Sequence, residues 1–211
     1  MNFSFEERAV MVEKLTRVQR RQRETREHIF RTAMELFRKK GFEHTTVTEI
    51  TEAADIGKGT FFLYFPTKEA VFGHLGEMLT EAMSALVDEG LRAKVPISAL
   101  IRQLFDVSAT WHEENRSLSE QVVMAGLRSG PVMDADAPNQ QRLLQLLEQL
   151  VRAGQARGEL KRDMRPEDGA LVLSGAYFST VVGWLREADD ARPLSARFGA
   201  SLDLVFRGMR K

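Results

Sequence analysis

Residues 41–72, GFEHTTVTEITEAADIGKGTFFLYFPTKEAVF, decide the fold, because they predict two short helices joined by a tight turn. Thr46 and Glu49 have the spacing of a capping box, in which the threonine oxygen accepts a backbone hydrogen bond and the glutamate reaches back. Residues 55–57 interrupt the first helix, and residues 58–64 form a second helix that is too short to be stable alone. This pattern predicts a helix-turn-helix, whose second helix can be held by its neighbours and enter the major groove of DNA.

A longer helix precedes this pair. Thr25 is the expected cap, and the helix runs to Lys40 with apolar residues on one face. Gly41 supplies the left-handed residue that ends it. Phe42 is then expected to fold back onto Phe37 and close a small core.

The stretch at 55–71 resembles the DNA-binding domain of the TetR family of transcriptional repressors. The family commonly shows Gly-Val-Ser-Lys-Gly-Thr-Leu-Tyr-His-His-Phe-Pro-Ser-Lys-Glu-Ala-Leu, and this chain has Asp-Ile-Gly-Lys-Gly-Thr-Phe-Phe-Leu-Tyr-Phe-Pro-Thr-Lys-Glu-Ala-Val without a gap. With the preceding helix, the resemblance covers residues 24–75. It implies an all-α fold with an N-terminal three-helix helix-turn-helix DNA-binding domain and a larger C-terminal helical domain for ligand binding and dimerisation.

Three positions depart from the family pattern. Asp55 stands where glycine is usual, and aspartate tolerates a left-handed backbone less well than glycine. Gly57 replaces a capping serine, which costs only a few tenths of a kcal/mol. Phe62 replaces a tyrosine that contacts DNA, so it either touches a thymine methyl group or simply packs. An unusual operator is the expected consequence.

The candidate DNA-binding residues lie on or beside the two short helices. Hydroxyls at the start of the first helix can meet a phosphate, lysine at the start of the second pairs with a guanine edge, and glycine permits close backbone approach. Two further residues match family positions that grip the DNA backbone, namely Tyr64 and Lys68. The full set is Thr46, Thr48, Lys58, Gly59, Thr60, Phe62, Tyr64 and Lys68. Phe61 and Phe65 are assigned to the core.

Charge is distributed unevenly along a chain whose formal net charge is zero. Residues 14–40 carry ten basic and three acidic side chains, whereas residues 73–211 carry 17 and 19. A basic arm leading into a helix-turn-helix fits phosphate attraction, although a solvated helix face has the same composition. The predicted organisation is a basic extension at 1–22, a helix-turn-helix domain at 23–72 and a C-terminal domain at 73–211.

Proline marks the expected helix boundaries in the remainder, since proline inside a helix costs about 3 kcal/mol. The predicted helices are 67–90, 96–114, 116–128, 138–157, 166–187 and 194–209, with a loop at 129–137. The helix from Thr67 should be shared by both domains, which makes it a natural lever for coupling them. No β-hairpin signal or repeat interrupts this helical reading.

The last two helices are expected to form a dimer. The segment 171–185 is apolar nearly all round, which suggests burial on more than one side, by a partner or as the central helix of a monomer. The resemblance implies the former, a symmetric homodimer through a four-helix bundle.

No catalytic, cofactor or metal site is predicted. The chain has no cysteine, and its four histidines lack the spacing of zinc or di-iron ligands. A small-molecule effector, apolar or aromatic, is expected among the middle helices, although aromatic and methionine side chains at helical spacing more often form plain core. The candidates are Phe105, Trp111, Met124, Tyr177 and Phe178.

The predicted function is therefore a ligand-responsive dimeric repressor released from a palindromic double-stranded operator. The alternative is a regulator of the same fold that responds to a partner protein and has no small-molecule inducer. A helical enzyme or carrier with a chance helix-turn-helix is a third class. The absence of cysteine, of a signal peptide and of a membrane-spanning apolar run favours a cytoplasmic protein without membrane contact.

Overall fold

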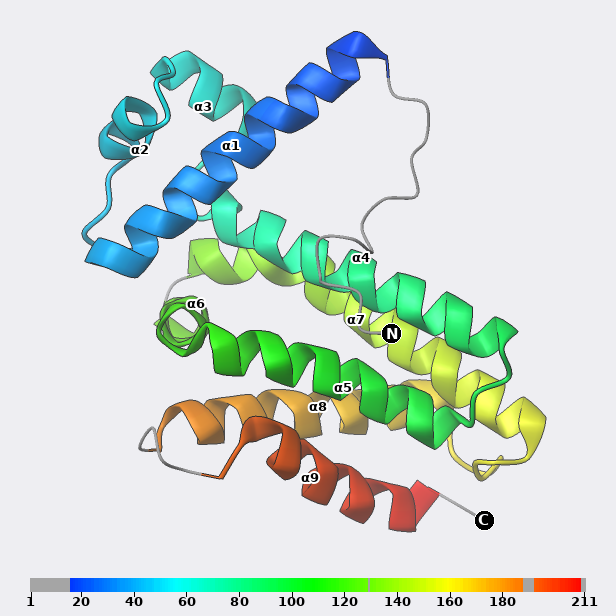
Figure 1. Cartoon of the computed structure of the whole chain (residues 1–211). Helices are drawn as coiled ribbons and strands as arrows, with labels where there is room; N and C mark the ends of the chain where they lie inside the picture. The colour runs from blue at the N-terminus through cyan, green and yellow to red at the C-terminus, as the bar shows by residue number, and fades with distance from the viewer. Residues whose placement is uncertain (1–15, 129, 188–191, 210–211) are drawn as a thin grey trace. The chain divides into compact units, whose positions relative to one another are not determined.

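The computed structural model describes residues 16–128, 130–187 and 192–209, and within them every regular element is a helix (Figure 1). The predicted all-α class is confirmed. No helix in this described part is both long and apolar enough to cross a membrane. The helices are α1 (Arg17–Lys40), α2 (Val47–Ala53), α3 (Lys58–Tyr64), α4 (Ala70–Arg92), α5 (Ile97–Glu114), α6 (Arg116–Arg128), α7 (Gly130–Arg157), α8 (Pro166–Leu185) and α9 (Leu194–Met209).

The chain divides into two compact units. The first comprises Met1–Gly76 with Ala125–Asp136, and the second comprises Glu77–Met124 with Ala137–Lys211. Residues 125–136 therefore group with the helix-turn-helix, although they fall within the predicted C-terminal domain. Helix α4 passes from the first unit into the second without a break, as the sequence predicted for the helix from Thr67.

Helix α1 begins earlier than predicted. Thr16 is its N-cap, because the Thr16 side chain accepts a hydrogen bond from the Gln19 backbone and the Gln19 side chain accepts one from Thr16. The expected cap at Thr25 is wrong, since its hydroxyl donates to the Arg21 carbonyl inside the helix. Residues 17–22 of the predicted extension are helical, and residues 1–15 lie outside the described part.

The core of the first unit is built around aromatic rings. Phe42 folds back onto Phe37 as predicted, with ring centroids 5.1 Å apart, and Phe72 from α4 packs 4.5 Å from Phe42. Phe61 and Phe65 are buried, which confirms their assignment to the core. These contacts hold the short α2 and α3 helices against α1 and the start of α4.

The predicted loop at 129–137 is wrong, because α7 begins at Gly130 and continues through Pro138. Pro131 is the second residue of α7, where the missing amide hydrogen would have had no partner. The start of α7 packs on α4 so closely that a Cβ atom at Gly73 would lie 2.7 Å from the Ala135 carbonyl oxygen. Glycine is therefore required at that contact.

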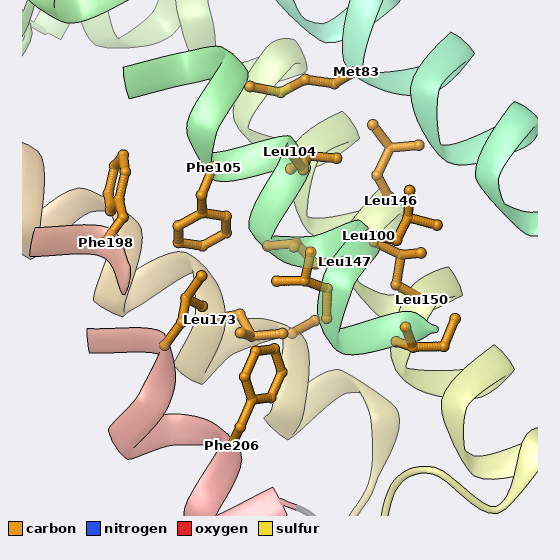
Figure 2. Packing of buried hydrophobic residues seen from close by; sticks show 14 of the residues in the cluster. Met83, Leu100, Leu104, Phe105, Leu146, Leu147, Leu150, Leu173, Phe198 and Phe206 are labelled. Carbon is orange, nitrogen blue, oxygen red and sulfur yellow. The ribbon is translucent and has the colours of Figure 1, made fainter. Parts of the chain in front are cut away.

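The second unit has one continuous apolar core, to which α4, α5, α7, α8 and α9 contribute (Figure 2). Helix α9 packs against both α5 and α8. Helix α5 contributes Leu100, Leu104 and Phe105 to this core, and α9 contributes Phe198 and Phe206. Burial of these side chains supplies the main stabilisation of this unit.

Candidate functional site

The N-terminus of α2 is held by the predicted capping box. The Thr46 side chain accepts from the Glu49 amide at 3.2 Å, and the Glu49 carboxylate accepts from the Thr46 amide at 2.9 Å. Glu49 also forms an ion pair with Lys40 at the end of α1. Two hydrogen bonds lower the pKa of Glu49 to about 2. The one from Lys40 has the larger effect, and the one from the Thr46 backbone amide has the next largest. The box therefore fixes α2 to α1 and remains charged at neutral pH.

The turn between α2 and α3 has backbone strain at Asp55, the position where the sequence departs from the usual glycine. Asp55 has φ of 52°, in the left-handed region that favours glycine. Gly57 precedes α3 in an extended conformation and provides no side-chain cap, so α3 depends on its neighbours for its start.

Helix α3 presents a row of side chains to solvent. Lys58 and Gly59 are exposed at its first turn, and Phe62 and Leu63 follow one turn later. Thr60 and Tyr64 are half-buried at the edge of this row, and Phe61 anchors the opposite face in the core. Nothing lies within 4 Å of a Cβ atom built on Gly59, so the space in front of its backbone is open. Within the first unit, Lys58, Gly59 and Phe62 are thus accessible together, and Thr60 and Tyr64 flank them with partly buried side chains.

Lys68 lies elsewhere, below the loop that leads into α2. Its ammonium group donates to the carbonyl oxygens of Phe42 at 2.8 Å and Thr45 at 3.0 Å, and it sits 4.1 Å from the centroid of the Phe42 ring. These bonds position the N-terminus of α2, where Thr46 and Thr48 lie. The structure therefore gives Lys68 a supporting contact in the loop.

The first turns of α1 form an exposed basic surface. Arg17, Arg20, Arg21 and Arg23 are exposed, and the first buried residue of the helix is Ile29. Farther along, the Arg26 guanidinium lies 5.7 Å from the centroid of the Phe65 ring, at the end of α3. The basic helix thus extends from the same small core that supports α3.

The second unit contains a buried polar cluster that sequence reasoning missed. The hydroxyls of Tyr177 and Ser108 lie 2.6 Å apart, and the Tyr177 hydroxyl lies 3.0 Å from His112 Nε2. On the other side of the ring, His112 Nδ1 is 2.5 Å from the Ser119 hydroxyl. Ser108 and His112 are one turn apart on α5, and this spacing is the sequence feature that could have indicated the cluster. The partners from α6 and α8 arrive through tertiary packing.

The five predicted effector residues do not all lie together. Phe105 and Tyr177 meet edge to face, with centroids 5.5 Å apart, and Tyr177 stacks on Phe198 at 5.3 Å. The ring centroids of Trp111 and His112 are 5.2 Å apart. Met124 packs against the apolar core of the second unit. Phe178 is 47% exposed on the outer face of α8.

The outer faces of α8 and α9 are rich in exposed apolar side chains. Leu171, Val172 and Phe178 on α8 and Leu204 on α9 are each exposed, from 47% at Phe178 to 68% at Leu204. Gly175 lies on the same stretch of α8, and nothing surrounds a Cβ atom built on it. Exposed apolar side chains on two neighbouring helices make this face a candidate interaction surface.

His112 makes stability depend on pH. Burial lowers its pKa to about 4 from an ordinary 6.5, so the unfolded chain binds a proton between these values while the folded chain does not. The free energy of unfolding is therefore fully retained above pH 6.5 and falls by about 1.4 kcal/mol per pH unit below it, until pH 4. Urea unfolding between pH 7 and pH 4.5 should show this slope in the wild type and a shallower slope in His112→Gln. His44→Gln removes an exposed histidine as the control, and an unchanged slope in His112→Gln would contradict the assignment.

Comparison with known proteins gives consistent results. Residues 29–75 match the family model described as bacterial regulatory proteins, tetR family. The structure of Thermus thermophilus FadR, a TetR-family transcriptional repressor in complex with lauroyl-CoA, is 31% identical with a TM-score of 0.73, covering 88% of this chain and 95% of that one. The HTH-type transcriptional regulator TcmR of Streptomyces glaucescens is 27% identical over 88% of this chain and 84% of its own.

A third similar protein is Bacillus subtilis FadR, solved in complex with stearoyl-CoA. It is 21% identical, with a TM-score of 0.68, and the alignment covers 86% of this chain and 98% of that one. At this identity the likeness supports the shared fold alone.

Proposed function

The chain belongs to the TetR family of bacterial transcriptional regulators, and we propose that it is a dimeric repressor released from a palindromic operator by a small apolar effector. Membership places it among transcriptional regulators and not among enzymes. The observation that carries the proposal is the exposed row on α3, which a capping box, an aromatic core and Lys68 hold in place.

In the proposed complex, α3 enters the major groove. Lys58 and Thr60 contact base edges, and Gly59 lets the backbone approach. Thr46, Thr48 and Tyr64 contact phosphates beside the groove, while the arginines at the start of α1 neutralise further phosphates. Lys68 acts by positioning the α2 N-terminus, where it bonds two loop carbonyls.

The exposed apolar surface of α8 and α9 supports a homodimer. A second copy would cover Leu171, Phe178 and Leu204, which a monomer leaves in water at a cost of about 25 cal/mol per Å² of apolar surface. Symmetry then pairs α8 and α9 with their counterparts in a four-helix bundle. Such a dimer carries two α3 helices, as an inverted repeat in the DNA requires.

We propose an acyl thioester as the effector. The Thermus thermophilus relative was solved in complex with lauroyl-CoA, and the interior of the second unit has an apolar core, so an acyl chain that entered it would have to displace packed side chains. Tyr177 and His112 place hydrogen-bonding groups within that interior, where a thioester carbonyl could be held. Because His112 is uncharged at neutral pH, the cluster suits a neutral carbonyl better than a carboxylate.

Helix α4 is the proposed lever. It carries Phe72 in the core of the first unit and Met83 and Val87 in the core of the second. An effector that shifts α4 would change the separation of the two α3 helices in the dimer. The effector alters DNA affinity only if it binds the DNA-bound and released forms with different affinity.

The test is selection of binding duplexes from a randomised library, followed by titration of the enriched duplex at several salt concentrations. We expect an inverted repeat, and an affinity whose logarithm falls with the logarithm of salt by about 0.9 per neutralised phosphate. Changing Arg17, Arg20 and Arg21 together to glutamine should make this slope shallower without changing the enriched sequence. Failure to enrich any sequence would contradict the proposed function.

A further inference from the structure

Helix α3 exposes two large apolar side chains side by side. Phe62 is 48% exposed and Leu63 is 77% exposed, on a helix of seven residues whose inner face already has Phe61 in the core. Leu63 is largely in water, and Phe62 leaves about half of its surface in water although one edge of its ring contacts Phe61. The apolar surface that the pair leaves in water is therefore available to a partner outside the folded chain.

The position of the pair puts it in the row that faces DNA in the proposed function. Phe62 lies one turn after Lys58, and Leu63 lies one turn after Gly59. The open space at Gly59 allows the helix backbone to come close to a ligand on this side. The Phe62 ring also packs edge to face on buried Phe61, with centroids 5.5 Å apart, which limits its freedom before binding.

The chemistry of the two side chains restricts what they can read. Neither can bond a phosphate oxygen or the polar edge of a base. The major groove displays one apolar group, the C5-methyl of thymine, which phenylalanine and other apolar side chains contact. Burying that methyl against Phe62 and Leu63 removes apolar surface from water on both partners.

We propose that Phe62 and Leu63 read thymine methyl groups, so that each operator half-site carries thymine at the bases beneath the second turn of α3. This inference rests on the proposed function and adds a base preference to it. Polar discrimination remains with Lys58 and Thr60, and the apolar pair supplies a second, independent contribution to specificity.

Replacement of thymine by deoxyuridine tests this directly, because it deletes only the methyl group and preserves base pairing. In the enriched duplex, each thymine is replaced in turn and binding is measured by fluorescence anisotropy. We expect a loss of roughly fourfold for each contacted methyl group, at one or two positions in each half-site. Equal affinity for every deoxyuridine duplex and the thymine duplex would overturn the proposal.

Variants of the protein assign the effect to its residues. Phe62→Ala and Leu63→Ala should each bind the thymine duplex more weakly than the wild type. At one position each variant should also lose the deoxyuridine penalty, the drop in affinity when that thymine is replaced. Combining each variant with each duplex in a double-mutant cycle measures this coupling. Lys58→Ala is the matched control, since it should weaken binding while keeping the penalty in full. Both apolar residues are exposed, and the helical circular dichroism of each variant checks that folding is retained. A penalty that persists in both alanine variants would also overturn the proposal, whereas failure to enrich any duplex counts against the proposed function instead.

Discussion

Phe178→Arg is expected to sediment as a monomer and to bind the enriched duplex roughly 100-fold more weakly than the wild type, because two linked half-sites become independent. The side chain lies in the exposed apolar surface of α8, where a dimer would bury an unpaired arginine at high cost. Gly175→Arg, on the same helix, should behave in the same way. Sedimentation velocity and anisotropy titration on the same samples measure both effects.

Leu127→Arg is the matched control for these variants. Leu127 is an exposed leucine on α6, outside the α8 and α9 surface, and receives the same charge. It should remain a dimer and keep its affinity for DNA. A Phe178→Arg protein that remains dimeric would show that the subunits associate through another surface.

Saturating lauroyl-CoA is expected to weaken the complex with the enriched duplex by about 5- to 150-fold, the range that a coupling free energy of 1–3 kcal/mol allows. Coenzyme A without the acyl chain should have no effect if, as proposed, the acyl chain supplies the binding energy. Laurate should act more weakly than the thioester, because uncharged His112 cannot compensate a buried carboxylate. Anisotropy titrations with each compound measure the three responses.

Tyr177→Phe separates effector recognition from DNA binding. It removes the hydroxyl that lies near Ser108 and His112 and leaves the ring stacked on Phe198. We expect unchanged affinity for DNA without ligand and a higher lauroyl-CoA concentration for half-release. If neither the acyl thioester nor laurate releases the wild type, the acyl effector is wrong, and control by a partner protein becomes the better hypothesis.

The parts of the fold that depend on neighbours in sequence could be predicted. The capping box of Thr46 and Glu49, the left-handed Asp55 and the contact of Phe42 with Phe37 each follow from residues a few positions apart. The start of α1 was also encoded locally, since Thr16 and Gln19 have capping-box spacing, and the choice of Thr25 overlooked it.

The loop predicted at 129–137 is wrong over 130–137, because the helix expected to begin at Pro138 begins at Gly130 and contains Pro138 in its interior. Pro131 falls in the first turn of α7, where the amide hydrogen has no partner. Pro138 has no amide hydrogen to donate to the carbonyl oxygen of Asp134, four residues earlier in α7. Both residues are exposed, so that carbonyl oxygen can bind water instead. Solvation of this turn makes the interior proline tolerable.

Tertiary contacts account for what the sequence could not predict at the candidate site. Folding brings the Lys68 ammonium to two carbonyls 23 and 26 positions away, a supporting role that no local pattern indicates, and its contact with DNA stays a prediction. His112 and Tyr177 are 65 positions apart, so their hydrogen bond leaves no local pattern. Phe178 could be assigned to an effector site or to an interface by composition, and only the packing of α8 places it on the outer face.

The central claim is that two α3 helices of one dimer occupy two half-sites of one duplex. The chain has no cysteine, so Ala53→Cys, at an exposed position at the end of α2, allows one spin label per subunit. Pulsed dipolar spectroscopy of the labelled protein on the enriched duplex should give a single narrow separation set by one or more turns of DNA, about 34–36 Å per turn. Absence of dipolar coupling on that duplex would contradict the claim, because it would mean that single subunits bind the DNA independently.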